Sequence, residues 1–378
     1  MLQLDYIIDS FSKTKVRKMK PFIRNLLRMS VYQIKYMDAV PDSAVCNEAV
    51  KLAKRHKFAQ LSGFVNGVLR NIARNIDSVQ FDTLSIRYSM PQWIVDRFVS
   101  AYGEKKAEEI FKAFHSKSTI SIRTNLTRCT PDELRAMLEA EGVTVTAVDE
   151  LNYAFVISGF DYLNGLQSFR DGLFYVQDIS SMLVAQTAAP KKGDYVIDVC
   201  AAPGGKSTHI AELLQGSGHV LARDLTDNKV DMIEENIERH GLNNMSAEVW
   251  DATVFDADSA GKADILICDL PCSGLGVLGR KKDIRYKMTP ESVDELAALQ
   301  RQILDTVHTY VKPNGVLVYS TCTIDEAENE DNVRWFIEKH PEFELDKSFA
   351  EGTGMKQILP GEHGSDGFFI ARFIKSKL

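Results

Sequence analysis

Two cysteines stand at positions where sequence patterns place reactive groups. Cys272 belongs to Asp269-Leu-Pro-Cys-Ser-Gly274, and Cys322 belongs to Ser320-Thr-Cys322; each motif follows an apolar run typical of a buried strand. The carboxyl ends of parallel strands meet at one edge of a sheet, so both thiols are expected there. A thiol has a pKa of about 8.5 and is nucleophilic as the thiolate, which a cation or a helix N-terminus favours. The alternative, a small core residue, is kept for Cys46, Cys129 and Cys268.

A third motif, Asp198-Val-Cys-Ala-Ala-Pro-Gly-Gly-Lys206, has the pattern of a strand, a turn and a helix. The strand is expected over residues 195–199 and the helix over residues 207–214. Gly204 and Gly205 let the backbone bend sharply and let a ligand approach closely. An ordinary strand-to-helix turn would have the same pattern, so this motif alone leaves the choice open.

Three further acids follow predicted strands: Asp224, Asp251 and Asp269. One acid in such a place is often the N-cap of the next helix, but three beside a glycine turn favour a ligand crevice. An acid at the end of the second strand can accept hydrogen bonds from both hydroxyls of a ribose, so Asp224 fits a nucleoside cofactor. A dinucleotide-dependent dehydrogenase is disfavoured because the turn lacks the GxGxxG spacing.

These motifs lie in a region of alternating strands and helices, residues 172–378, which predicts an α/β domain with a mostly parallel, Rossmann-like sheet. A helix over 178–189 precedes the first strand. Further helices are expected over 229–241, 291–310 and 325–340, with a turn at Pro313-Asn-Gly315. The last apolar run, residues 367–374, is expected to be an antiparallel strand at the edge of the sheet.

Residues 1–80 contain no strand signal, and their apolar residues recur three and four apart, which predicts a helical bundle. Pro41 with Ser43 is interpreted as a turn and the N-cap of the next helix. This region has 14 Lys and Arg against 6 Asp and Glu, a balance of +8 within a net charge of −7, which leaves −15 for the rest. A basic module that contacts phosphates would have this charge, and so would a solvated lysine-rich helical face.

Residues 81–171 are predicted to connect these two regions. Helices are expected over 92–114, followed by a strand (119–124), a helix that begins at Thr130, and two strands (143–148 and 153–157). This order resembles an RNA-recognition-type α/β module, although the strands lack its aromatic signature.

Composition narrows the class of protein further. The sequence shows no signal peptide and no apolar run long enough to cross a membrane, so a cytoplasmic protein without a membrane partner is expected. The six cysteines form no CxxC pair, which predicts reduced thiols. Cys268 and Cys272 have no matching Cys or His pair at zinc spacing, so no metal is expected. We expect a monomer.

Taken together, the motifs at 198–206, 269–274 and 320–322 resemble those of RNA cytosine-5 methyltransferases of the RsmB (Sun, NOP2/NSUN) family. Val45-Cys-Asn-Glu-Ala-Val50 and Phe64-Val-Asn-Gly-Val-Leu-Arg70 are similar to the later helices of a NusB-type RNA-binding domain, which suggests an N-terminally truncated version. The resemblance covers nearly the whole chain. It implies S-adenosylmethionine as cofactor, small-subunit ribosomal RNA as substrate, and a covalent cysteine–cytosine intermediate.

The resemblance also implies roles for single residues. Cys322 would be the nucleophile, Cys272 would assist release of the product, and Asp269 would hold the edge of the cytosine. The cofactor would bind along the 198–206 motif, with Asp224 on the ribose and Asp251 near the adenine; Lys206 could contact the substrate instead. The residues expected to bind cofactor are Cys200, Ala201, Ala202, Pro203, Gly204, Gly205, Lys206, Asp224, Asp251 and Asp269. Those expected to contact RNA phosphates are Arg280, Lys281, Lys282 and Arg285.

Other functions stay open at this point. A tRNA cytosine-5 methyltransferase would have the same motifs, although the NusB-like start makes it the weaker alternative. A ribosome-assembly or antitermination factor with a vestigial methyltransferase domain would keep the RNA-binding start, but the intact motifs argue against it.

Overall fold

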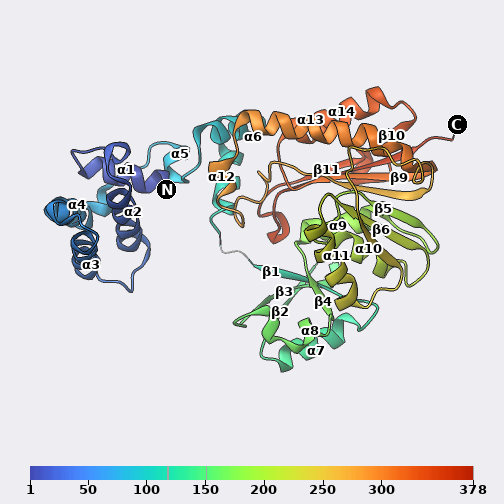
Figure 1. The fold of residues 1–378 in the computed structure, drawn as a ribbon, viewed down its shortest axis with the longest axis horizontal. Helices are drawn as coiled ribbons and strands as arrows, with labels where there is room; N and C mark the ends of the chain where they lie inside the picture. Colours follow the sequence, from blue (N-terminus) through green and yellow to red (C-terminus); the bar gives the residue numbers. More distant parts are fainter. Residues whose placement is uncertain (117–118, 150, 378) are drawn as a thin grey trace. The chain divides into compact units, whose positions relative to one another are not determined.

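The computed structural model describes residues 1–116, 119–149 and 151–377 of the 378. The chain divides into two compact units, Met1–Lys112 and Ala113–Leu378. Figure 1 shows the first unit as helices only and the second as a mixture of helices and two sheets. No helix in the described part of the chain is both long and apolar enough to cross a membrane.

The first unit confirms the predicted all-helical start. Its main helices are α1 (Leu2–Phe11), α2 (Pro21–Tyr36), α3 (Asp42–Arg55) and α4 (Ser62–Asn75), followed by α5 (Leu84–Arg87) and α6 (Gln92–Ala113). The apolar residues spaced three and four apart meet in one core that includes Ile7, Leu27 and Val65. The N-cap predicted for α3 is wrong: the helix begins at Asp42, one residue before Ser43, because Pro41 already has the extended backbone of a cap. Gly103, with φ 76°, divides α6 into two helical pieces.

The second unit begins with a small antiparallel sheet. Strands β1 (Ile120–Thr124), β2 (Thr144–Val148), β3 (Leu151–Ser158) and β4 (Phe174–Val176) lie in the order β2-β3-β1-β4. Helix α7 (Pro131–Ala140) starts in a capping box in which Thr130 and Glu133 each accept the other's backbone N–H, as the N-cap prediction requires. β4 lies beyond residue 171, so the small sheet continues into residues that the sequence assigned to the next domain.

The large sheet has the strand order β10-β12-β9-β8-β5-β6-β7, with β11 paired to β12. Its strands are β5 (Tyr195–Asp198), β6 (His219–Asp224), β7 (Met245–Val249), β8 (Ala263–Asp269), β9 (Val311–Thr321), β10 (Phe343–Leu345), β11 (Met355–Ile358) and β12 (Phe368–Lys375). β5 to β9 run parallel, and β12 runs antiparallel to β9, as predicted. The prediction that β12 is an edge strand is wrong, because β10 and β11 pair with its other side.

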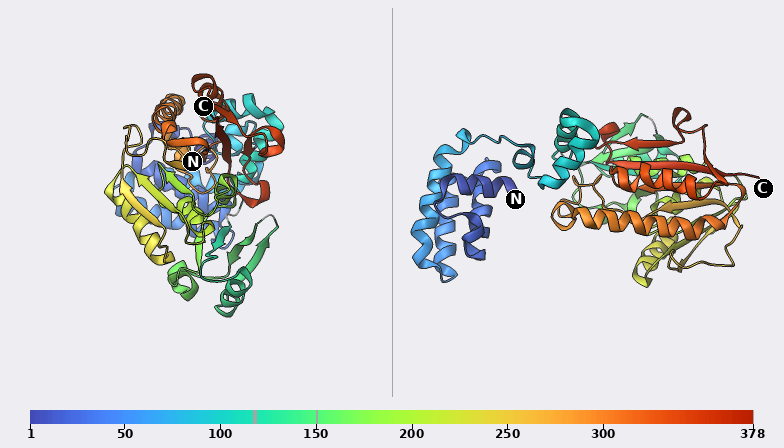
Figure 2. Two further views of the ribbon diagram at one scale, coloured as in Figure 1. Left: turned by 90° about the vertical axis from the view of Figure 1, so that its right-hand side faces the viewer. Right: turned by 90° about the horizontal axis from the view of Figure 1, so that it is seen from above.

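Helices cover both faces of the large sheet (Figures 1 and 2). One face packs against α9 (Ile179–Ala188), α10 (Gly205–Leu213) and α11 (Asp227–His240), through Val184, Ile210 and Ile233. The other packs against α13 (Pro290–Val307) and α14 (Glu330–Lys339), through Leu304 and Phe336. This is the three-layer, Rossmann-like arrangement that the alternating pattern predicts.

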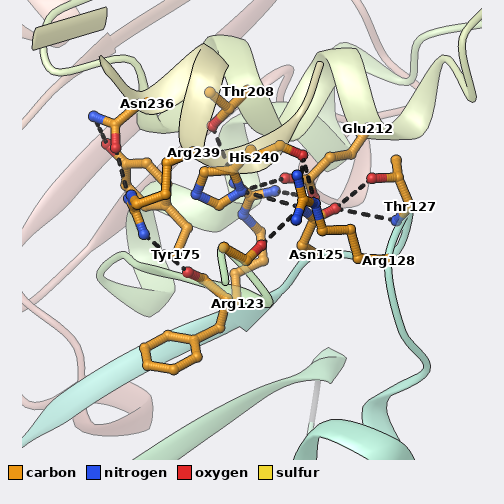
Figure 3. Close-up of polar contacts among 12 residues, drawn as sticks. Arg123, Asn125, Thr127, Arg128, Tyr175, Thr208, Glu212, Asn236, Arg239 and His240 are labelled. Atoms are coloured by element: carbon orange, nitrogen blue, oxygen red, sulfur yellow. Dashed lines mark hydrogen bonds and ion pairs between the residues drawn. The ribbon is translucent and has the colours of Figure 1, made fainter. Parts of the chain in front are cut away.

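A buried polar cluster joins the small sheet to the large one (Figure 3). Arg123 of β1 is fully buried and donates to Glu212 of α10 at 2.5 Å, to Thr208 at 3.1 Å and to Gln177 at 3.0 Å. Removing one partner of such a buried ion pair typically costs about 3–5 kcal/mol, because the other charge stays buried. The cluster therefore fixes the small sheet on helix α10, which covers one face of the large sheet.

Candidate active site

A cavity of about 420 Å³ opens at the carboxyl edge of the large sheet. Residues that end β5 and β8 line it, and so do Cys322 beyond β9 and the turn before α10. This is the edge at which open α/β sheets bind ligands. The residues named from sequence that line the cavity are Cys200, Ala201, Ala202, Pro203, Gly205, Lys206, Asp269, Arg280, Lys281 and Cys322.

The two cysteines singled out from sequence lie side by side, although fifty residues separate them. The Sγ atoms of Cys272 and Cys322 are 3.1 Å apart, and both thiols are free. The loop that carries Cys272 is clamped by Gly276, whose N–H donates to the Cys322 carbonyl at 3.1 Å and whose carbonyl accepts from Gly367 at 2.9 Å. A Cβ at Gly276 would lie 2.3 Å from the Gly367 carbonyl oxygen, so this backbone crossing requires glycine. Sequence reasoning missed Gly276.

The surroundings make the two thiols unequal. The pKa of Cys322 is lowered by the hydrogen bond from Cys272, and Lys206 and Lys281 lower it further, against burial and Asp269. The pKa of Cys272 is raised well above its ordinary value by the same hydrogen bond, and burial and Glu328 add to the rise. The pair therefore favours a thiolate on Cys322 and a proton on Cys272.

A charged pair lies beside the thiols on the cavity wall. Lys206 of α10 and Asp269 at the end of β8 form an ion pair of 2.6 Å, and Ser320 donates to the other oxygen of Asp269 at 2.7 Å. Lys206 also lies 5.3 Å from the centre of the Phe368 ring. The positive charge of Lys206 also lowers the pKa of Cys322, so this lysine lies within electrostatic reach of that thiol. The sequence left open whether Lys206 contacts the cofactor or the substrate.

The glycine turn closes the other side of the cavity. Gly204 has φ 102°, a conformation that strongly favours glycine, and a Cβ at Gly205 would lie 3.1 Å from the ring of Tyr175. The turn is held to β6 by Asp224, which accepts the N–H of Ala202 at 2.9 Å. Of the two glycines, Gly205 lines the cavity, together with Ala201, Ala202 and Pro203 of the turn.

The predicted nucleoside-binding acids differ in their surroundings. Asp224 is buried and also accepts from Leu225 N–H and from Lys229, both at 2.8 Å. Asp251 is exposed, and its carboxylate accepts from the N–H and hydroxyl of Thr253. Neither side chain lines the cavity described above, so the structure brings Asp224 to the turn and leaves Asp251 outside the cavity wall.

Asp198, which ends β5, is a site residue that the sequence placed in the motif without a role. It is fully buried, lines the cavity, and accepts from Ser207 at 2.5 Å. Burial raises its pKa to about 7, and Asp269 adds to the rise while Ser207 and Lys206 oppose it. Its position at a strand end was the available signal, but nothing in the sequence distinguishes it from an ordinary cap.

We expect Asp198→Asn to stabilise the free protein at pH 8 but not at pH 4. Because the folded pKa is raised, the unfolded chain releases this proton first, and stability falls as pH rises from about 4 to about 7. At pH 8 the buried, ionised carboxylate lowers the free energy of unfolding by up to about 4 kcal/mol, since one pKa unit is worth about 1.36 kcal/mol. A neutral amide removes this cost. Thermal unfolding at both pH values tests this. The same gain at pH 4 as at pH 8 would contradict it.

The predicted RNA-contacting residues fall into two groups. Lys281 and Lys282 are exposed, and Lys281 lines the cavity. Arg280 is exposed as well, but it pairs with Asp178 at 2.9 Å and with Asp366 at 2.6 Å. The prediction for Arg285 is not supported: its side chain is buried and donates to the Leu278 carbonyl at 2.9 Å, so it braces the loop from inside.

Sequence reasoning also missed Tyr175, Asp178 and Asp366, which line the cavity. Asp178 caps α9 by accepting from Ser180, and Asp366 precedes β12. Both acids meet at Arg280 only in the folded chain, so no local pattern could have revealed them. Tyr175 lies in the three-residue strand β4, which is too short for a periodic signal.

Family models match the chain in three places. The description "16S rRNA methyltransferase RsmB/F" matches residues 185–374, and "NusB family" matches residues 1–74. A ferredoxin-like domain of RsmF/B-like methyltransferases matches residues 90–160.

Individual relatives agree with these matches. The probable ribosomal RNA small subunit methyltransferase B of Bacillus subtilis (strain 168) is 38% identical over 392 residues, which covers 99% of this chain and 87% of that protein. The probable ribosomal RNA small subunit methyltransferase B of Synechocystis sp. is 32% identical, with the same coverage. Among solved structures, NSun6 from Pyrococcus horikoshii with SFG is 25% identical with a TM-score of 0.69, and the match covers 76% of this chain and 99% of that one.

Fold and site together define a Rossmann-like methyltransferase preceded by a ferredoxin-like subdomain and a NusB-like helical domain. The chain belongs to the 16S rRNA methyltransferase RsmB/F family. Its cofactor is S-adenosylmethionine. The turn before α10, which lines the cavity at the carboxyl edge of the sheet, fits that cofactor.

Proposed function

We propose that this protein transfers a methyl group from S-adenosylmethionine to carbon 5 of a cytosine in 16S ribosomal RNA, through a covalent bond between Cys322 and the base. One observation carries the proposal: two free thiols with unequal tendencies to ionise lie 3.1 Å apart, and one of them, Cys322, lines the cavity. Carbon 5 of cytosine is too weakly nucleophilic to be methylated directly. One thiol can add to the ring and activate it, and the second can remove the proton that is left on carbon 5.

Cys322 is the group that activates the ring. Its thiolate adds to carbon 6, which makes carbon 5 an enamine-type nucleophile and divides one difficult step into two easier ones. S-adenosylmethionine, when bound, supplies the electrophilic methyl group. The ion pair of Lys206 and Asp269 faces the same cavity, where a carboxylate can accept from the amino group of cytosine and an ammonium can stabilise charge that develops on the ring.

Cys272 is the base that releases the product. The methylated ring keeps a proton on carbon 5, and this proton must leave before the Cys322 bond can break. The contact with the Cys322 thiolate is the main cause that holds the proton on Cys272 in the free protein. Once the Cys322 sulfur is bonded to carbon it carries no charge, so Cys272 can release its own proton to water and then accept the carbon 5 proton as a thiolate.

For the cofactor, we infer that the backbone of residues 200–206 lies along it and that Asp224 accepts from the ribose hydroxyls, with Asp251 toward the adenine. The carboxylate of Asp224 already orders the turn through Ala202, so it would serve both the turn and the ribose.

We expect Asp224→Ala to weaken S-adenosylmethionine binding roughly tenfold or more while RNA affinity stays unchanged, since about 1.4 kcal/mol corresponds to a factor of ten. The substitution removes the acceptor for Ala202 N–H and leaves Lys229 without its partner. Calorimetry with each ligand separates the two affinities. Asp227→Ala, an exposed acid at the start of the next helix, is the matched control. Unchanged cofactor affinity would rule out the ribose assignment.

For the RNA, we propose that residues 1–80 supply sequence-independent contacts through their excess of positive charge. Residues 81–171 would support the RNA on the small sheet, and residues 172–378 would hold the catalytic site. Lys281 and Lys282 would contact phosphates beside the target base, which must be turned out of any helix to reach the cavity.

Bisulfite sequencing of total RNA from cells with and without the gene tests the function directly. We expect one protected cytosine of 16S rRNA to lose its protection when the gene is deleted. Loss at a tRNA position instead would favour the tRNA methyltransferase alternative. No change at any cytosine would favour the assembly factor with a vestigial methyltransferase domain.

A further inference from the structure

Glu328 is a buried carboxylate directly behind the thiol pair. It ends the short helix η6 (Glu326–Glu328), has no solvent exposure, and no lysine, arginine or histidine of the described residues forms an ion pair with it. Its carboxylate accepts instead from Ser273 N–H at 2.9 Å, from the Ser273 hydroxyl and from Gln300 at 2.9 Å. A buried carboxylate needs such donors. Proteins keep one where its charge or its hydrogen bonds contribute to structure or function.

These hydrogen bonds hold Cys272 from both sides. Ser273 follows Cys272 and is held by Glu328, while Gln300 also donates to the carbonyl of Pro271, which precedes Cys272, at 2.8 Å. The Ser273 hydroxyl lies 3.0 Å from that of Thr323, the residue after Cys322. Glu328 therefore reaches, through Ser273, the loops that carry both thiols.

The charges around the two thiols are arranged asymmetrically. Lys206 and Lys281 lie on the Cys322 side and favour its thiolate. Asp269 opposes them there, but it is paired with Lys206 at 2.6 Å. Glu328 acts on Cys272, where a negative charge favours the protonated thiol.

We propose that Glu328 is the positioning residue of the thiol pair, which holds the Cys272 loop and keeps the shared proton on Cys272, so that Cys322 is the thiolate. The assignment of that thiolate as the attacking group rests on the function proposed above. The location of the shared proton on Cys272 does not rest on that function, because it is a property of the free protein.

The groups around Glu328 act on its pKa in opposite directions, and the pKa is raised overall. Burial raises its pKa, the bonds from Ser273 and Gln300 lower it, and Asp325 of the same turn raises it. Tyr319 faces it as well, with its hydroxyl bonded to the Glu328 carbonyl and its own pKa raised well above the ordinary value by burial. The other titratable groups near Glu328 and the thiols are Asp325, Tyr319, Lys206, Lys281 and Asp269.

Glu328→Gln tests the charge with little change of shape. The amide oxygen can accept from Ser273 N–H and Gln300, and the amide nitrogen can donate to the Ser273 hydroxyl, so every contact has a counterpart. The free protein is labelled with iodoacetamide between pH 6 and 10, without RNA or cofactor, and labelling of each cysteine is followed by peptide mass spectrometry. Comparing the same cysteine between variants cancels differences in access.

We expect Glu328→Gln to shift the labelling profile of Cys272 to lower pH and that of Cys322 to higher pH. The rate at Cys272 near pH 7 should rise, because a lower pKa increases the fraction of thiolate. Glu328→Asp, which keeps the charge, should retain the wild-type order of the two cysteines. Glu326→Gln, on the exposed side of the same short helix, is the matched control and should leave both profiles unchanged.

Two outcomes would overturn the proposal. Profiles that are identical in Glu328→Gln and the wild type would show that the charge does not distribute the proton, and a Glu328→Asp profile like that of Glu328→Gln would do the same. If the proposed function alone were wrong, the labelling shifts would appear as expected, but deletion of the gene would leave every 16S cytosine unchanged.

Discussion

Cys322→Ala is expected to abolish methyl transfer, with a loss of roughly three orders of magnitude or more, because removal of a covalent nucleophile eliminates the pathway rather than weakening it. The side chain lines the cavity and is the thiol whose ionisation its neighbours favour. Transfer of a labelled methyl group from S-adenosylmethionine to 16S rRNA measures the loss. Cofactor affinity should change little, since Cys322 is not among the residues proposed to bind the cofactor.

Cys129→Ala is the matched control for loss of a thiol. Cys129 lies in the small subdomain, where burial raises its pKa, and it has no place in the cavity. The Cys129→Ala variant should transfer methyl groups to 16S rRNA at a rate close to that of the wild type. A Cys322→Ala variant that still transfers methyl groups at the control rate would rule out Cys322 as the nucleophile.

Cys272→Ala is expected to trap the covalent complex, because addition to carbon 6 needs only Cys322 while release needs a base for the carbon 5 proton. The complex should appear as a slowly migrating protein–RNA band on a denaturing gel. Its formation should require higher pH than turnover of the wild type, since the substitution removes the hydrogen bond that most lowers the pKa of Cys322. Stoichiometric rather than catalytic methylation should accompany the band.

Cys272→Ser separates the two roles of this residue. A hydroxyl can still donate to the Cys322 thiolate but is a poor base, so the serine variant should trap the complex faster than the alanine variant at neutral pH. If Cys272→Ala turned over normally and Cys322→Ala formed the band instead, the roles of the two thiols would be reversed.

Much of this site could be predicted from the sequence because its residues follow long, periodic elements. The apolar run before the Pro-Cys motif is a strand, Ala263–Asp269, as predicted, and this strand fixes the position of Asp269 and of the loop that follows. Parallel pairing of β8 with β9 then brings Cys272 and Cys322 to one edge, since the register aligns Asp269 with Ser320. Pattern and topology together were sufficient to bring the thiols together.

The rest depends on tertiary contacts that no local pattern records. Pro313 to Gly315, predicted as a turn, lies inside strand β9. The predicted helix over 325–340 is divided at Asn329, whose backbone is not helical, and this break lets Glu328 point inward to Ser273. Arginine is a residue type that often contacts RNA phosphates, but the buried side chain of Arg285 donates a hydrogen bond to the Leu278 carbonyl.

The closeness of the thiols also makes the site sensitive to oxidation. Their sulfurs are 3.1 Å apart, about 1 Å more than a disulfide bond, and one of them is favoured as the thiolate that attacks oxidised sulfur. The arrangement that suits covalent catalysis is therefore the one that an oxidant can close, and a closed pair has neither nucleophile nor base. The activity proposed for this pair therefore requires both thiols in the reduced state.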